Sequence, residues 1–444
     1  MDRGKQEDEQ VKQTKFLVGA ATAAHQVEGN NKKSDYWAME QLPGSNFSEP
    51  SLDAADHYHR YKEDLQLLAD TGANAYRFSI EWARIEPQKG VYDETEIAHY
   101  REVLLTCHQL NLTPIVTLHH FTSPKWLITE GGWEAQTTIA YFRQYAQLIA
   151  ERLGDLIPYV CTINEANMGK QIRKLIEGMQ AAAQQAPEAA TEEKTADLQI
   201  GLNELQANDE RAIFNQGLAD SFEIAPDKIQ TFLAPRSEAG EAIIMACHQA
   251  AREAFKAIHP ETQVGITFSL YDHQALPGAE ALAEAGQQAD FLDYLPYLEA
   301  DDFLGVQNYT RKIHALPGQA VPEEPTRMTK MGYEFYPEAL GNVLQAVAKQ
   351  WHKPILVTEN GVATDNDAER IEFMARAIEG VAQAKAAGVP VIGYCYWSLL
   401  DNFEWQLGYA QTFGLIAVDR KTQTRYPKES LAYLHQIVEK MQNS

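Results

Sequence analysis

The sequence lacks several features of membrane, secreted and metal-binding proteins. It has no apolar run long enough to span a bilayer, and the first ten residues, Met1 to Gln10, are polar and charged, unlike a secretory signal. Only 4 of the 444 residues are cysteine, and they show no metal-ligand spacing. We therefore expect a cytoplasmic protein whose cysteines are reduced core residues, with no bound metal or cofactor.

Positive charge is also scarce. Lys and Arg number 38 against 62 Asp and Glu, which gives a formal net charge of −24. A surface of this sign repels phosphate backbones and anionic lipid, so we expect neither nucleic acid nor a membrane as partner. A small-molecule substrate fits this composition better, and the sequence does not indicate an oligomeric state.

What the chain does have is eight short apolar runs that alternate with helical patterns. Strand and helix in alternation predict a parallel sheet with crossover helices, and eight such units predict a closed (β/α)8 TIM barrel. The predicted strands are Phe16 to Ala21, Ala73 to Ile80, Pro114 to His120, Tyr159 to Asn164, Val264 to Leu270, Phe303 to Tyr309, Pro354 to Glu359 and Val391 to Trp397. The clearest helical patterns are Ala55 to Asp70, Thr138 to Leu153, Glu241 to Ile258 and Ala368 to Ala387.

Two segments fall outside this alternation. We expect residues 1–15 to be a polar tail and residues 16–444 to be one TIM-barrel domain. Within that domain, residues 169–231 are rich in Ala, Gln and Glu and nearly free of aromatics. We interpret them as an insertion after the fourth strand, with helices at Ile172 to Gln184 and Ala196 to Asn208, at the rim of the barrel. A surface excursion without a role is the alternative.

Several predicted strands end in polar or aromatic side chains that could do chemistry. Parallel barrel strands present their carboxyl ends at one rim, where barrel enzymes have their active sites. The residues at these ends are Arg77, His120, Asn164, Glu165, Gln307, Tyr309, Glu359 and Trp397. So many polar endings predict a lined pocket at that rim.

Glu165 and Glu359 are the two residues most indicative of function. Each follows a β-branched apolar run and stands beside an amide, Asn164 or Asn360. Two carboxyl groups facing one cleft can act as proton donor and nucleophile on a glycosidic bond, if their environments separate their pKa values. Arg77 could hold the nucleophile ionised.

The expected rim also has residues suited to a sugar ring. Aromatic faces match the C–H faces of a pyranose, and amides, imidazoles and carboxylates bridge its hydroxyls. The aromatic candidates are Trp397, Trp405, Phe121 and Phe413, and the polar ones are Gln26, His120, Asn164 and Glu404. Of the adjacent His119 and His120, only one can line the pocket, and we choose His120 because neighbours on a strand face opposite ways.

At these positions the sequence resembles glycoside hydrolase family 1, the retaining β-glycosidases built on a TIM barrel. The matching motifs are Gly19 to Gly29, Asp56 to Asp64, Tyr76 to Trp82, Thr162-Ile163-Asn164-Glu165, Thr358-Glu359-Asn360-Gly361 and Tyr396 to Trp405. Each motif alone is moderately specific, whereas all of them in this order are very specific. The resemblance covers nearly the whole chain outside the first dozen residues and the 169–231 segment.

The resemblance implies a role for each matching residue. Glu165 matches the acid/base and Glu359 the nucleophile, with Arg77 and Tyr309 as the residues that orient the nucleophile. Because the 169–231 segment follows Glu165, whose proton goes to the leaving group, we expect this segment to cover the leaving-group side of the site. Gln26, His120, Asn164, Glu404, Trp397 and Trp405 match the set that contacts the glycone. The chain departs from the family at Ala166 (usually Pro), Gln307 (commonly Asn), Phe121 (usually Trp) and Val18 (often Trp).

The resemblance implies hydrolysis of terminal β-D-glucosides, with β-galactosides and β-fucosides as open alternatives. Glu404 lies in the loop where relatives acting on 6-phosphosugars bind phosphate, and its charge favours an unphosphorylated sugar. Other possibilities are a transglycosylase, a metal-dependent amidohydrolase and a sugar-binding pseudo-enzyme. The amidohydrolase would need His-x-His after the first strand, where the chain has Ala21-Thr22-Ala23, and the pseudo-enzyme would be favoured by loss of either Glu.

Overall fold

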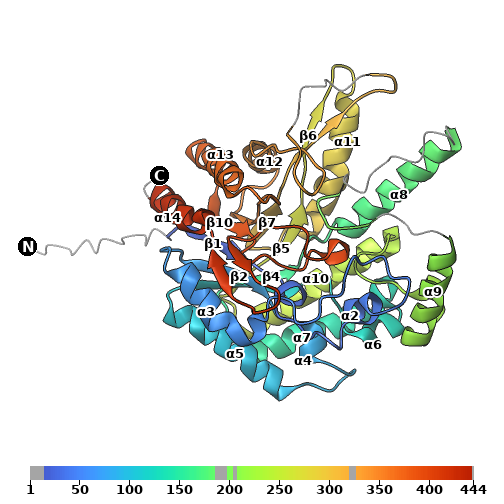
Figure 1. The fold of residues 1–444 in the computed structure, drawn as a ribbon. Coiled ribbons are helices and arrows are strands. Elements are labelled where there is room, and N and C mark those ends of the chain that lie inside the picture. The colour runs from blue at the N-terminus through green and yellow to red at the C-terminus, as the bar shows by residue number, and fades with distance from the viewer. Residues whose placement is uncertain (1–14, 186–197, 204–207, 320–326, 443–444) are drawn as a thin grey trace, which may run out of the picture.

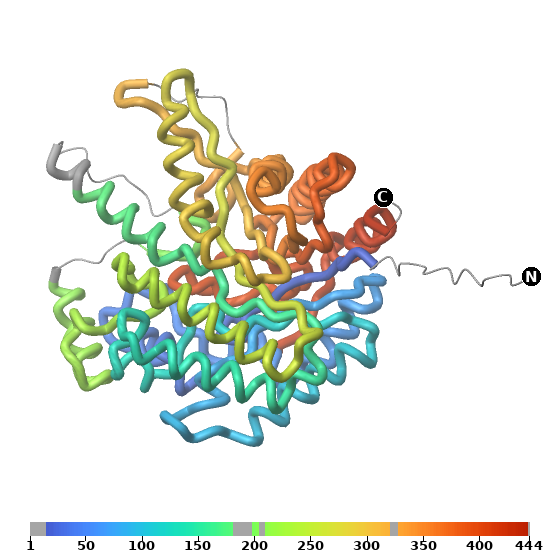
Figure 2. Tube along the Cα trace, turned by 180° about the vertical axis from the view of Figure 1, so that it is seen from behind, coloured from blue at the N-terminus to red at the C-terminus, as the bar shows by residue number. Residues whose placement is uncertain are grey.

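The computed structural model describes residues 15–185, 198–203, 208–319 and 327–442. Its centre is a closed barrel of eight parallel strands in the order β1-β10-β9-β7-β5-β4-β3-β2 (Figures 1 and 2). The barrel strands are β1 Leu17–Ala21, β2 Ala75–Ser79, β3 Thr113–His119, β4 Tyr159–Ile163, β5 Gln263–Ser269, β7 Phe303–Gln307, β9 Ile355–Glu359 and β10 Val391–Trp397. The predicted TIM barrel and its eight strands are confirmed, with ends that differ by up to two residues.

Helices surround the barrel in Figure 1 and cover the outer faces of the strands. They are α1 Ala24–Val27, α2 Asp35–Glu40, α3 His57–Ala69, α4 Trp82–Ile85, α5 Glu94–Gln109, α6 Lys125–Thr129, α7 Thr137–Leu153, α8 Met168–Gln185, α9 Asn208–Phe222, α10 Glu238–Ile258, α11 Glu280–Asp290, α12 Ala339–Ala348, α13 Asp367–Ala386 and α14 Glu429–Gln442. The four predicted helices correspond to α3, α7, α10 and α13. Helix α10 begins three residues earlier than expected because the Ser237 hydroxyl caps it by accepting from the Gly240 N–H at 3.0 Å.

Side chains that alternate along the strands divide the core into two parts. Leu17, Ile115, Phe303 and Leu356 point into the barrel and pack on one another, whereas their neighbours pack outward on the helices. All four cysteines are buried and form no disulfide. Within the described residues, no helix is both long and apolar enough to cross a membrane.

Two small sheets lie outside the barrel. Strand β6 (Asp272–Ala275) continues from β5, strand β8 (Arg311–His314) continues from β7, and these two extensions pair in parallel. Strands β11 (Ile416–Val418) and β12 (Arg425–Pro427) form an antiparallel pair. In Figures 1 and 2, α8 and the β6–α11 region project from the barrel beside each other.

The insertion after the fourth strand is partly as predicted. Helix α8 confirms the expected helix at Ile172 to Gln184. The expected helix at Ala196 to Asn208 is wrong for Leu198 to Asn203, which has no helical conformation, while residues 196–197 and 204–207 lie outside the described residues. Residues 1–14 of the predicted tail also lie outside them, so the division into tail and catalytic domain stays a prediction.

Candidate active site

The parallel barrel brings the carboxyl groups of Glu165 and Glu359 to one rim. Glu359 is the last residue of β9, and Glu165 stands two residues after β4 ends. Both side chains are buried, with only 3 % of each residue exposed. Residues far apart in the chain thus meet because strand direction is the same throughout the barrel.

Three donors surround the Glu359 carboxylate. Arg77 Nη1 donates to Oε1 at 2.5 Å, and the Tyr309 hydroxyl donates to Oε2 at 2.5 Å. Gln307 Nε2 also donates to Oε1, at 3.0 Å. Burial raises the pKa of Glu359, while the Arg77 charge and the hydrogen bonds from Tyr309 and Arg77 pull that pKa back down. The anion is therefore solvated by fixed protein donors instead of water.

Glu165 has a different environment. Burial raises its pKa well above the usual value, the Glu359 charge raises it further, and a hydrogen bond with Ser269 opposes both. Its backbone lies in the left-handed region at φ 43°, where Thr267 Oγ1 accepts from the Glu165 N–H at 2.9 Å. If the pair shares one proton, Glu165 binds it and Glu359 keeps the charge.

Asn164 links this pair to His120. Its Oδ1 accepts from Arg77 Nη2 at 2.5 Å and from Gln307 Nε2 at 2.7 Å, which leaves Nδ2 to donate to His120 Nε2 at 3.1 Å. Burial and the Arg77 charge hold the pKa of His120 well below its usual value, so the ring is neutral with its proton on Nδ1. That Nδ1 has no hydrogen-bond partner among the described residues.

Gln26 and Glu404 provide further groups for a polar ligand. Gln26 Nε2 donates to Phe403 O at 2.8 Å and to Glu404 Oε2 at 3.2 Å, while its Oε1 has no partner within the described chain. Burial, followed by the Glu359 charge, raises the pKa of Glu404 to about 8. A buried acceptor at Gln26 and a buried donor at His120, both unpaired, are what a neutral hydroxylated ligand would satisfy.

The four predicted aromatic residues are all buried around the same rim. Trp397 and Trp405 stack on the His120 ring, with centroid distances of 5.6 and 6.1 Å. Phe121 packs on Trp405 at 5.1 Å, and Phe413 meets Tyr309 edge-on at 6.0 Å. The structure thus brings together every residue that the sequence nominated for the site.

Part of the predicted insertion, Leu198 to Asn203, follows an irregular path that the sequence did not indicate, and we call this segment the strap. Gln199 Oε1 accepts from the Tyr309 N–H at 2.7 Å, and Gln199 Nε2 donates to Ser269 Oγ at 3.1 Å. At the other side, the Gly201 N–H hydrogen-bonds the Glu404 carboxylate, and Gly201 O accepts from the Gln406 N–H at 3.0 Å. The strap therefore touches neighbours of both carboxyl groups.

This placement differs from the sequence prediction, which put the insertion over the leaving-group side alone. The strap reaches Glu404, a residue of the predicted glycone set. Six irregular residues have no periodicity from which such a path could be predicted. Ser269, by contrast, ends β5, so the rule that polar strand ends line the site could have found it.

The comparisons with known proteins agree with this geometry. The sequence profile of Glycosyl hydrolase family 1 matches residues 9–443. The chain belongs to this family. The resemblance noted from the motifs is thereby confirmed, and the enzyme is a β-glucosidase-type glycoside hydrolase acting on O-glycosyl bonds.

Relatives of this family 1 enzyme include glycosidases with different names. A β-glucosidase from Agrobacterium sp. is 31 % identical, over 94 % of this chain and 92 % of its own length. A 6-phospho-β-galactosidase from Clostridium acetobutylicum is 30 % identical, over 95 % and 96 %. The crystal structure of a β-glycosidase superimposes with a TM-score of 0.84 at 40 % identity, covering 96 % of both chains.

Proposed function

We propose that the family 1 enzyme hydrolyses β-glycosides with retention of configuration, with Glu359 as nucleophile and Glu165 as acid/base. The observation that supports this assignment most is the unequal surroundings of the two carboxyl groups. Arg77, Tyr309 and Gln307 all donate to Glu359, whereas burial and the Glu359 charge favour the protonated form of Glu165.

The reaction has two displacements. In the first, a Glu359 oxygen bonds to the anomeric carbon while the glycosidic C–O bond breaks and Glu165 gives its proton to the leaving oxygen. In the second, Glu165 takes a proton from water, whose oxygen bonds to the anomeric carbon and releases Glu359. Each step inverts the carbon once, so the product keeps the β configuration.

For the glycone, we propose a terminal unphosphorylated β-D-glucoside, with β-galactosides and β-fucosides as alternatives. His120 Nδ1 and Gln26 Oε1 offer one donor and one acceptor to sugar hydroxyls. Glu404 would repel a phosphate whenever it is ionised. Because a relative is a 6-phospho-β-galactosidase, the phosphorylated substrate is the competing candidate.

A panel of aryl β-glycosides tests both parts of this proposal. The panel compares 4-nitrophenyl glucoside, galactoside, fucoside and their 6-phosphates, and NMR identifies the anomer of the first sugar released. We expect turnover of an unphosphorylated member and a β product. A preference for a 6-phosphate would overturn the glycone assignment, and an α product would overturn the double displacement.

We also propose that the enzyme works in the cytoplasm. Its four cysteines are buried and unpaired, as in proteins of reducing compartments. Fractionation of the source cells, followed by the glycosidase assay, would check this, and activity confined to an oxidising compartment would contradict it.

A further inference from the structure

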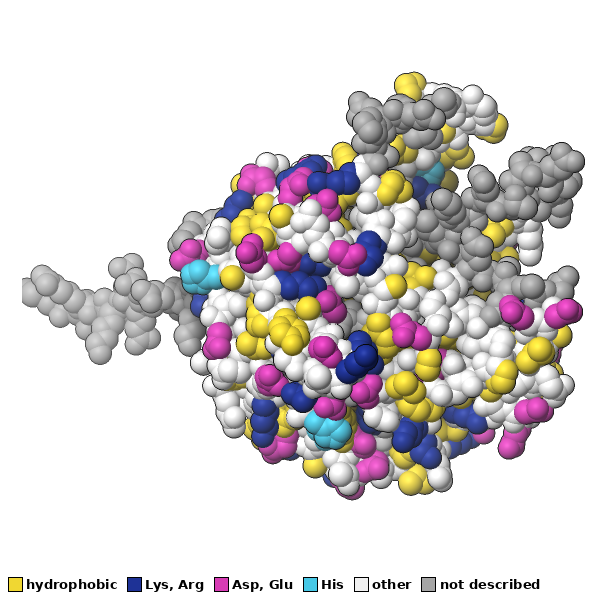
Figure 3. Space-filling model, in the orientation of Figure 1, with side chains coloured by type: hydrophobic (Ala, Val, Ile, Leu, Met, Phe, Trp, Pro, Cys, Tyr) yellow, Lys and Arg dark blue, Asp and Glu magenta, His cyan; other side chains and the backbone are white. Residues whose placement is uncertain are grey.

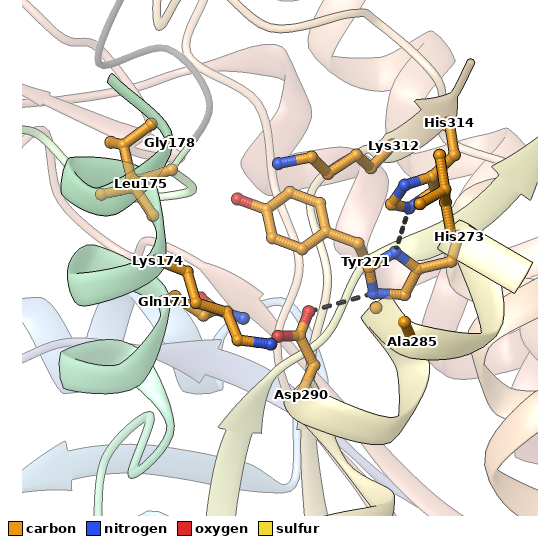
Figure 4. Close-up of a pocket in the computed structure, with 13 residues that line it drawn as sticks. Gln171, Lys174, Leu175, Gly178, Tyr271, His273, Ala285, Asp290, Lys312 and His314 are labelled. Carbon is orange, nitrogen blue, oxygen red and sulfur yellow. Dashed lines mark hydrogen bonds and ion pairs between the residues drawn. The ribbon is translucent and has the colours of Figure 1, made fainter. Parts of the chain in front are cut away.

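A second pocket lies outside the barrel mouth, between α8 and the β6–β8 sheet (Figure 4). Its volume is about 370 Å³, which is enough for one substituted ring. One wall is a single face of α8, and the facing walls come from β6, β8, α11 and the strap residue Leu198. None of the residues proposed above for catalysis or for the glycone lines this pocket.

Two ammonium groups point into this pocket from opposite walls. Figure 4 shows Lys174 reaching in from α8 and Lys312 reaching in from β8. Lys312 lies over the Tyr271 ring, with Nζ 5.8 Å from the centroid, and neither lysine forms an ion pair with a carboxylate of the described chain. In Figure 4 the Lys174 side chain extends toward Asp290 and the Lys312 side chain extends across Tyr271, so the charge available to an anionic ligand is that of Lys312.

The Asp290 carboxylate in the pocket wall already has a hydrogen-bond partner. Asp290 Oδ2 accepts from His273 Nε2 at 3.0 Å, so His273 Nδ1 is an acceptor and receives the His314 Nε2 proton at 2.9 Å. Burial, His273 and Lys312 lower the pKa of His314 to about 4, so the ring is neutral and its Nδ1 has a lone pair. His314 can therefore accept a hydrogen bond from a ligand hydroxyl.

A second acceptor lies at the base of the pocket. Gln171 is only 7 % exposed, and its Nε2 donates to Ser269 O at 3.1 Å. Its Oε1 has no hydrogen-bond partner among the residues that the structure describes. A buried amide oxygen left unpaired in a cavity wall indicates a ligand or water that donates to it.

The remainder of the lining is apolar. Leu175, Leu198 and Ala285 face the cavity, and Leu282 is 43 % exposed although it is a large hydrophobic side chain. Gly178 adds open space, since a Cβ placed there would meet no atom within 4 Å. These walls suit the faces of a flat ring, and a free phosphate or sulfate would leave them uncovered.

From these contacts we propose that the pocket binds a hydroxylated aryl carboxylate. Its carboxylate would lie at Lys312, its ring against the leucines, and its hydroxyl at His314. The ligand is the free acid, because a hydroxyl that donates to His314 cannot also be the glycosidic oxygen at Glu165. Gln171 and Gln199 both bond to Ser269, which contacts Glu165, so one layer of side chains separates the pocket from the acid/base.

Calorimetric titration of the full chain with 4-hydroxybenzoate tests the site without using catalysis. We expect binding that weakens about tenfold or more in Lys312→Met and with 4-hydroxybenzyl alcohol, which lacks the charge. Lys349→Met, which removes an exposed lysine elsewhere, is the matched control. Equal affinity for acid and alcohol, or for wild type and Lys312→Met, would overturn the proposal.

Gly178→Phe provides a second, structural test of location. The new ring enters open space on an exposed helix position, so the fold should keep its melting temperature while the pocket is filled. We expect 4-hydroxybenzoate binding to be lost. Undiminished binding in this variant would show that the acid binds elsewhere, and the proposal would fail.

Discussion

The barrel mouth and the outer pocket both contain charged groups, but they hold them in opposite ways. At the mouth, Glu359 has hydrogen bonds from three side chains and is almost fully buried. In the outer pocket, Lys174 is exposed and Lys312 is partly exposed over the Tyr271 ring. Fixed, buried charges are what a reaction needs, because they require no reorganisation, whereas exposed charges can select a ligand and release it.

The face of the molecule in Figure 3 has no large patch of one charge sign. Figure 3 shows acidic and basic side chains interspersed over the visible face. Selectivity for charge must therefore come from local groups, such as Glu404 at the mouth or Lys312 in the pocket. Substitutions at the mouth should show how much each of its groups contributes to the reaction.

The largest effect should follow from removing the nucleophile. Glu359→Gly should lower kcat by at least about 10⁴-fold, because the covalent intermediate can no longer form. Added azide should then react at the vacated face and yield an α-configured glycosyl azide, which NMR identifies. Glu261→Gly, at a residue with no role in the site, is the control, and a β-configured azide would contradict the assignment.

Removing the acid/base should depend on the leaving group. Glu165→Ala should cost about 10²- to 10⁴-fold on an alkyl glucoside, whose oxygen needs a proton, and much less on a dinitrophenyl glucoside. The measurement is kcat/KM for both substrates in both proteins. Equal losses on the two glucosides would refute a proton-donating role for Glu165.

A smaller effect should follow from removing one donor to the nucleophile. Tyr309→Phe deletes the 2.5 Å hydrogen bond to Glu359 but keeps the ring against Phe413, so kcat/KM should fall about 10- to 100-fold. Because that hydrogen bond lowers the pKa of Glu359, the acid limb of the pH profile should move to higher pH.

The alkaline limb of that profile is the internal control for Tyr309→Phe. It reports loss of the proton from Glu165, whose raised pKa comes mainly from burial and from the Glu359 charge. Activity should therefore fall as pH rises through this pKa in both proteins. A variant that moved the alkaline limb and left the acid limb in place would contradict the assignment of the two carboxyl groups.

The smallest effect should come from the strap. A Cβ at Gly201 would approach Glu404 O to 2.5 Å and Glu404 Cγ to 3.0 Å, so Gly201→Ala must displace the strap or Glu404. We expect the glucoside-to-galactoside ratio of kcat/KM to change about three- to tenfold. Gly178→Ala, at a glycine with open space around it, is the matched control.

An unchanged glycone ratio in Gly201→Ala, with an altered ranking of aryl aglycones, would return the strap to the leaving-group side, as the sequence analysis placed it. Either result would show whether Leu198 and Gly201, three residues apart on one strap, serve the outer pocket and the mouth separately.

The sequence by itself determined the barrel and its main chemical groups. Apolar runs that end in Glu165 or Glu359 predict buried strands with polar ends. In a parallel barrel, the carboxyl ends of all strands lie at the same rim. The motifs around these residues specified the family. Local patterns sufficed because strand burial and strand direction are properties of short segments.

Only the tertiary structure decided which of these groups touch. Gln307 bonds both Asn164 and Glu359, and Gly201 meets Glu404. Lys174 and Lys312 share one pocket. Each of these arrangements joins segments that lie far apart in the chain. The β6–β8 pairing and the strap have only a few residues each, too short for a periodic signal. Their positions come from packing and hydrogen bonding against the finished barrel, which no local pattern records.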